Sequence, residues 1–101
     1  MAELIKKHKD KIKELKLIKC GINDDGAVLL LKAMEGCLKL ASVNLANNSL
    51  SDKIVYNIVN LLNKNSCISS CYFTNNNFTV SSKEKIKSYN RNGKIKIFVY
   101  R

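Results

Sequence analysis

The sequence predicts an α/β fold, a short right-handed solenoid with a parallel sheet on its concave side and helices on its convex side. Two observations support this prediction. In the segment 40–50, apolar residues fall at the first, fourth, sixth and eleventh positions, and an asparagine falls at the ninth. The same spacing recurs in the segments 12–22 and 68–78, with cysteine or asparagine at the ninth position each time. A period of about 28 residues indicates stacked units of one strand and one helix.

Length and composition indicate a single domain. A chain of 101 residues buries one modest core, and 46% hydrophobic residues is ordinary for a globular protein. No apolar run reaches the length of a membrane-spanning helix, and the lysine-rich N-terminus does not resemble a targeting segment. We therefore expect an intracellular, cytoplasmic protein that does not contact a membrane.

The first eleven residues are predicted to form an N-terminal helical cap. Ala2 and Ile5 fall exactly one period before Leu30 and Ala33, which are expected on the buried face of the next helix. The alternative, a basic helix lying on a membrane, would need a longer apolar face. The whole chain, 1–101, is then one domain, with repeats at 12–39, 40–67 and 68–93 and a closing strand at 94–101.

Each repeat is expected to begin with a strand and to continue into a helix. The first strand lies near residues 14–18. Asn23, Ser51 and Thr79 recur at the same phase, and all three are residue types that cap helix N-termini. Their recurrence predicts helices at about 24–35, 52–64 and 81–90.

The closing strand departs from the period. Ile95–Tyr100 is apolar at alternate positions, and its inward residues align with the earlier strands if about four residues are deleted before it. An exposed apolar edge is prone to aggregation, and the charges of Lys94, Lys96 and Arg101 oppose this. A second copy of the chain, another subunit or a further segment could each pair with this edge.

With these positions assigned, the chain resembles leucine-rich repeat proteins of the ribonuclease-inhibitor-like class, whose units combine a strand with a full helix. The resemblance covers about residues 12–93. It implies a binding scaffold that faces its partner with the concave sheet. In that class, tropomodulin-like proteins cap actin filaments, but no motif of this sequence singles out actin.

No catalytic or metal-binding pattern is present in the sequence. The single histidine, His8, has no predicted nucleophile or carboxylate partner, and the four glycines are scattered. The four cysteines form no C-x-x-C pair, which argues against zinc and fits a reducing compartment. Asp24 and Asp25 fall in the first turn of a helix, where the dipole favours acids. We expect no enzyme activity, no cofactor and no metal.

The net charge of +10 lies at the two ends of the chain. Residues 1–19 carry seven lysines and three acidic residues, and residues 83–101 carry seven basic residues and one acidic residue. The segment between them is neutral. Two interpretations stay open: basic patches bind acidic partners or nucleic acid, and charged ends keep a stack of repeats soluble.

A binding face is predicted on the concave side of the sheet, because side chains that alternate with core positions point away from the helices. Lys96 is expected beside Tyr72, and Phe98 beside Thr74. The surface is mostly uncharged, and Tyr72 is its best anchor because tyrosine is favoured at interface hot spots. The candidate residues are Lys16, Ile18, Lys19, Ser42, Asn44, Ala46, Asn47, Ser70, Tyr72, Thr74, Asn75, Lys96 and Phe98.

The predicted function is a non-enzymatic protein–protein interaction module that binds its partner through the concave sheet or the solenoid ends. Two alternatives stay open. A nucleic-acid or ribonucleoprotein accessory subunit would use the basic termini, although a neutral centre with one mid-sheet aromatic offers few stacking surfaces. An architectural subunit would dock through its C-terminal strand, where self-association is also conceivable.

Overall fold

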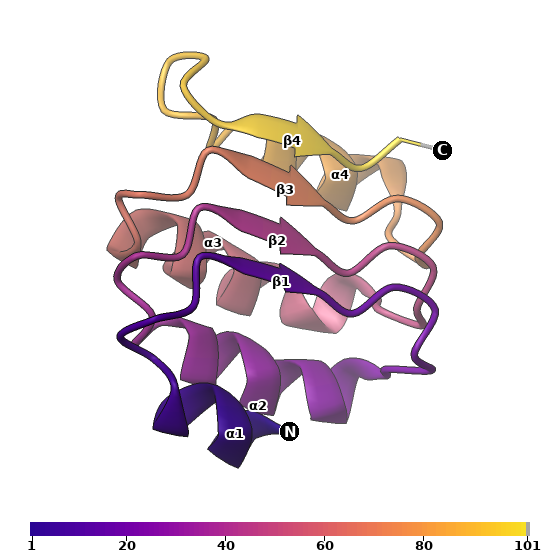
Figure 1. Ribbon diagram of the computed structural model, residues 1–101. Coiled ribbons are helices and arrows are strands. Elements are labelled where there is room, and N and C mark those ends of the chain that lie inside the picture. Colours follow the sequence, from indigo (N-terminus) through magenta and orange to yellow (C-terminus); the bar gives the residue numbers. More distant parts are fainter. Residues whose placement is uncertain (101) are drawn as a thin grey trace.

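Four strands form one parallel sheet in the computed structural model, which describes residues 1–100 (Figure 1). The strands are β1 (Glu14–Lys16), β2 (Ser42–Asn44), β3 (Ser70–Tyr72) and β4 (Lys96–Phe98), and they lie side by side in sequence order. Parallel neighbours need a crossover connection, and a helix stands between each pair. The predicted α/β class with a parallel sheet is confirmed. Position 101, which the prediction included in the closing strand, lies outside the described residues.

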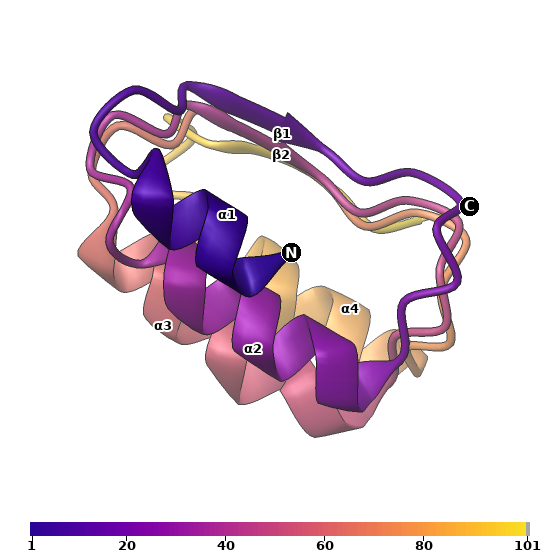
Figure 2. The ribbon, with the colours of Figure 1, turned by 60° about the horizontal axis from the view of Figure 1, so that its bottom comes forward.

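The helices form a second layer on one face of the sheet, as Figure 2 shows. The predicted N-caps Asn23, Ser51 and Thr79 are confirmed, because each side chain accepts a hydrogen bond from a backbone amide two or three residues ahead. The elements of this layer are α1 (Ala2–Lys7), α2 (Asp24–Met34), the 3-10 turn η1 (Asp52–Ile54), α3 (Val55–Lys64) and α4 (Val80–Lys87).

The register of the first three strands keeps the predicted period. Leu15 lies opposite Val43, and Val43 lies opposite Cys71, so the interval is the same at both steps. β4 begins earlier in the chain than this period predicts. Cys71 lies opposite Ile97, whereas an unbroken period would place Cys71 opposite Val99. Two residues are therefore deleted before β4, whereas the prediction deleted four.

This register corrects two predicted positions on the sheet. Lys96 lies opposite Ser70, and Phe98 lies opposite Tyr72, where the prediction had placed Lys96. Side chains of a strand alternate with a period of two, so deletions of two and of four residues bury the same set of apolar side chains. The apolar pattern therefore could not distinguish the two registers.

Asparagine side chains connect the turns that follow the strands. The Nδ2 group of Asn48 donates to the carbonyl oxygens of Leu17 at 2.9 Å and Leu45 at 3.0 Å. Its Oδ1 atom accepts from the backbone amide of Cys20 at 3.0 Å. Asn76 repeats this arrangement one unit later. The asparagine side chains thus form hydrogen bonds with backbone groups of the turns, which are not paired by the hydrogen bonds between strands.

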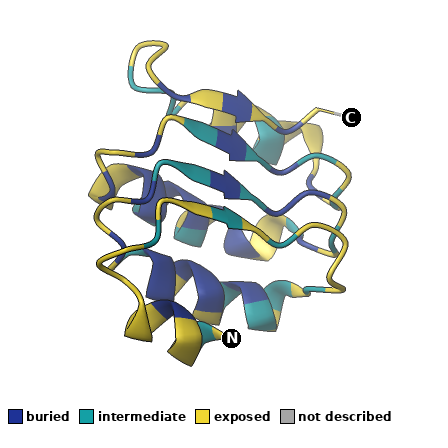
Figure 3. Ribbon diagram, in the orientation of Figure 1, coloured by how far each residue is buried: buried dark blue, intermediate teal, exposed yellow. Residues whose placement is uncertain are grey.

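The solenoid of three and a half repeats stays a prediction, and what the structure shows is a compact two-layer α/β domain. Its radius of gyration is 12.2 Å and its extents are 35 × 31 × 18 Å, and a compact domain of this length has a radius of gyration of about 13 Å. The longest extent is less than twice the shortest. The buried side chains form one core, from Ile5 in α1 to Val99 beyond β4 (Figure 3).

Candidate functional site

Among residues 1–100, no element covers the face of the sheet opposite the helices, which we call the open face (Figure 1). Successive side chains of a strand point to opposite faces. The middle residue of each strand is more buried than its two neighbours, so the middle residues point into the core. The open face consists of Glu14, Lys16, Ser42, Asn44, Ser70, Tyr72, Lys96 and Phe98.

Two aromatic rings lie stacked on the open face. The ring centroids of Tyr72 and Phe98 are 4.8 Å apart, and the rings are tilted by 5°. They meet because the register of β4 places Phe98 opposite Tyr72. Phe98 remains 43% exposed and Tyr72 is half-buried. The pair is a flat apolar platform with hydrogen-bonding capacity at the tyrosine hydroxyl.

The centre of the open face is polar but uncharged. The Oγ atoms of Ser70 and Ser42 are hydrogen-bonded at 3.1 Å. The Oδ1 atom of Asn44 accepts a hydrogen bond from the backbone amide of Ala46 at 3.1 Å. Charges lie only on the outer strands. Lys16 and Glu14 form an ion pair at 3.7 Å, and both side chains are exposed to solvent. The pair therefore contributes little stability.

The predicted residues that follow the strands differ in how far they are exposed. Ile18 is 43% exposed and Thr74 is half-buried. Ala46 is only 7% exposed, so it offers little surface for the predicted contact with a partner.

Lys19, Asn47 and Asn75 occupy the turn after β1, β2 and β3, and all three are exposed. Their φ angles are 56°, 58° and 56°, in the left-handed region that asparagine tolerates better than most residues. These three candidates therefore have a clear structural role in the turn. Their side chains lie at the end of the open face and not in its centre.

The cysteines differ sharply in chemistry. Cys20 and Cys67 are exposed, whereas Cys37 and Cys71 are buried. Burial raises the pKa of the Cys71 thiol to about 12, and burial followed by the charge of Asp10 raises the pKa of Cys37. Both buried thiols are therefore protonated at neutral pH and behave as small apolar side chains.

The described part of the chain shows no cluster of side chains that is typical of a catalytic site. His8 is exposed at the end of α1, and no hydrogen bond within residues 1–100 joins its side chain to another group. In the same residues, no three His, Cys, Asp or Glu side chains are grouped to hold a metal ion. None of the helices described between residues 1 and 100 has the length and apolar character needed to cross a membrane.

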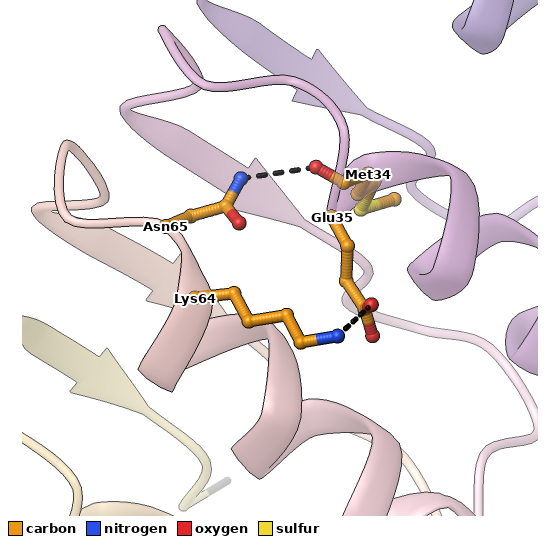
Figure 4. Close-up of polar contacts among 4 residues, drawn as sticks. All are labelled: Met34, Glu35, Lys64 and Asn65. Atoms are coloured by element: carbon orange, nitrogen blue, oxygen red, sulfur yellow. Dashed lines mark hydrogen bonds and ion pairs between the residues drawn. The ribbon is translucent and has the colours of Figure 1, made fainter.

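Sequence reasoning missed two side chains that cap helix C-termini. Asn65 is fully buried, and its Nδ2 donates to the carbonyl oxygens of Met34 at 3.0 Å and Cys37 at 2.9 Å, at the end of α2 (Figure 4). Arg91 does the same at the end of α3, where its guanidinium donates to the carbonyl of Leu62 and, at 2.7 Å, to that of Asn65. Asn65 and Arg91 are 26 residues apart, the same interval that separates Cys71 from Ile97, but they differ in residue type, so no recurring residue marked these caps in the sequence.

The domain is thus a small parallel α/β fold with a helical layer and an open sheet, and solved structures of this kind exist. The C-terminal domain of tropomodulin from Caenorhabditis elegans matches with a TM-score of 0.81 and 13% identity, over 99% of this chain. The chain spans 62% of that structure's length. Leiomodin-1 actin-binding site 2 matches with a TM-score of 0.75 and 15% identity, over 99% of this chain and 76% of that one.

Neither a family model nor a curated protein matches the sequence. The predicted resemblance to leucine-rich repeat proteins of the ribonuclease-inhibitor-like class was wrong, since the structures that match include a tropomodulin domain and a leiomodin domain. The spacing of apolar residues predicts the local strand, turn and helix of each unit. It does not distinguish among families that use such units, and at 13–15% identity the likeness establishes the fold alone.

Proposed function

We propose that this chain is a non-enzymatic protein-binding domain whose partner contacts the open face at the stack of Tyr72 and Phe98. The stack is the observation that supports this proposal. Partly exposed aromatic side chains surrounded by polar groups are typical of interface hot spots. A sheet of four strands is about 15 Å wide, which suits a peptide, a helix or one edge of a larger protein.

Nucleic acid is a weaker alternative for this face. Lys16 and Lys96 lie only on the outer strands, and Lys16 pairs with Glu14 at 3.7 Å. Proteins that bind single strands place bases on free aromatic surfaces. Here Tyr72 and Phe98 stack on each other, with their ring centroids 4.8 Å apart, so no space for a base lies between them.

We propose actin as the first partner to test. The support is the likeness of the fold to leiomodin-1 actin-binding site 2, which extends over 99% of this chain. A net charge of +10 also favours association with a partner surface of negative charge. No residue of this chain is assigned to an actin contact by that likeness.

The test compares three proteins for binding to monomeric actin and for co-sedimentation with actin filaments. They are the wild type, the double variant Tyr72→Ala with Phe98→Ala, and the control double variant Leu38→Ala with Tyr56→Ala. The control removes apolar side chains that are 67% and 73% exposed outside the open face. We expect the open-face variant to weaken binding about tenfold or more, because truncating hot-spot residues costs at least that much. The control should bind as the wild type does.

Equal weakening in both double variants would contradict a specific role for the open face. If the wild type binds neither form of actin, actin is excluded as the partner, and affinity capture from a cell lysate with the same three proteins then tests the face. Captured proteins that are unchanged in the open-face variant would contradict it. Binding to a mixed-sequence RNA with a steep salt dependence would support the nucleic-acid alternative instead.

A further inference from the structure

β4 is the last strand of the sheet, and one of its edges has no partner strand among residues 1–100. The Lys96 amide donates to the carbonyl of Ser69 at 2.9 Å, and the Phe98 carbonyl accepts from the amide of Phe73 at 2.7 Å. Backbone groups of successive residues in a strand point to opposite edges. The amide and carbonyl of Ile97 therefore point away from β3, and an unpaired edge of this kind is a template for another strand.

A groove with a volume of about 330 Å³ runs along this free edge, lined by Lys87 at the end of α4, by Asn90 and by residues 95–98. The other end of the sheet differs. There the cavity lies between α1, α2 and the turn at 20–23, and no residue of β1 lines it. Only the β4 edge combines unpaired backbone groups with a groove in the described part of the chain.

Lysines flank this edge on both sides of the sheet. Lys96 extends from the open face, Lys87 lines the groove on the helical side, and the exposed Lys94 stands just before the strand. Residues 80–100 contain six basic residues and a single acidic one. The edge is therefore complementary to a segment of negative charge.

A second copy of this chain is the less favourable occupant. Pairing two β4 edges would bring the lysines of one copy against the same lysines of the other, and like charges side by side destabilise strand pairing. Natural sheets use lysine at an edge for this reason. A segment with acidic side chains would instead neutralise these charges.

We propose that the β4 edge binds an extended acidic segment of a partner protein as a fifth strand. Its backbone pairs with the amide and carbonyl of Ile97. Because side chains of a strand alternate between faces, acidic residues at successive positions reach Lys96 on the open face and Lys87 in the groove. The site adjoins the stack at Phe98, but it depends on the backbone of Ile97 and on the lysines, so either proposal can fail while the other stands.

The test uses three labelled peptides with the intact chain, measured by fluorescence anisotropy. The first is Glu-Glu-Val-Glu-Glu-Val-Glu-Glu, the second has lysine in place of each glutamate, and the third is the acidic peptide with every backbone nitrogen methylated. We expect the second and third to bind at least about tenfold more weakly, because one loses charge complementarity and the other loses its strand hydrogen bonds. Amide hydrogen exchange at Ile97 should slow in the presence of the first peptide and remain unchanged at Leu15.

Two charge-reversed variants test where on the chain the acidic peptide binds. Lys94→Glu with Lys96→Glu should weaken binding of the acidic peptide by about tenfold or more. The control, Lys13→Glu with Lys39→Glu, changes the net charge equally but lies away from β4, and it should retain binding. Melting curves by circular dichroism establish that both variants are folded.

Four results would overturn the proposal. Equal weakening in the two variants, or equal binding of the methylated peptide, would reduce the effect to general electrostatic attraction. Absence of binding by the acidic peptide at low salt would remove the site. A dimer detected by sedimentation velocity, with Ile97 protected from exchange in the absence of peptide, would make a second copy the occupant.

Discussion

The two ends of this domain are closed in different ways. At the first end α1 packs against α2, and Ile5 is only 3% exposed, so an apolar side chain closes the core. At the other end α4 buries only Ile86. Ile95 and Val99 add buried apolar side chains there, and the guanidinium of Arg91 reaches carbonyl oxygens at the end of α3 and in the loop that follows it.

The surfaces left at the two ends differ accordingly. The cavity at the first end, about 360 Å³, is lined mainly by apolar side chains such as Met1 and Leu29. At the other end the Nζ atoms of Lys83 and Lys87 lie 5.4 and 5.7 Å from the centre of the Tyr100 ring, a cation–π arrangement that holds positive charge beside the free edge. One end thus contributes to stability through apolar burial, and the other keeps charge and backbone groups accessible.

The largest effect is expected from Ile5→Ala. Removing a buried aliphatic side chain costs about 2 kcal/mol or more in free energy of unfolding, measured by urea denaturation. Leu4→Ala is the matched control on the same helix, because Leu4 is 58% exposed and its truncation should change stability by less than about 0.5 kcal/mol. Equal stability of the two variants would mean that α1 does not close the core.

A smaller effect is expected from Arg91→Ala at the opposite end. The variant leaves several backbone carbonyls without a donor, and we expect a loss of about 1–2 kcal/mol in the same experiment. Arg91→Lys should not restore this stability, because a lysine ammonium lacks the planar fork that reaches several acceptors together. Full recovery by lysine would show that only the charge matters, and Lys85→Ala provides the exposed control.

The smallest effect concerns a polar contact between the second and third units, on the side of the basic end. The Asp52 carboxylate accepts from the Thr79 amide at 2.9 Å and from its hydroxyl at 2.7 Å, and these bonds lower the pKa of Asp52 from its ordinary value of 3.8. The native state binds this proton more weakly than the unfolded chain. The stabilisation is therefore present above pH 3.8 and is lost as pH falls through the lower native pKa.

Thermal melts of the wild type and Asp52→Asn between neutral pH and pH 3 test this contact. The variant should melt at a lower temperature at neutral pH, and the difference should shrink as pH falls below 3.8, because the unfolded wild type takes up a proton there before the native state does. A difference that stays constant over the whole range would contradict the assigned cause. Asp25→Asn, on the exposed side of α2, is the control.

Much of the local structure was predictable from the sequence. Period-two alternation identified Leu15, Val43 and Cys71 as inward residues, and recurrence of Asn23 and its equivalents located three helix starts. These features depend on neighbouring residues along the chain, whose spacing the sequence states directly. The predicted binding residues included both Tyr72 and Phe98, but Phe98 was expected beside Thr74, so the stack of the two rings was not predicted.

Tertiary structure alone decided how the units fit together. The stack of Phe98 on Tyr72 depends on whether two or four residues are deleted before β4, and both choices bury the same side chains. The reach of Arg91 to the end of α3 depends on a residue about one unit away, because Leu62 precedes Arg91 by 29 residues. The sequence by itself determined which residues form strands, helices and caps, because those follow from local spacing. The open face with its paired rings, the compact shape and the grooved basic edge arise from contacts between units, which no local pattern encodes.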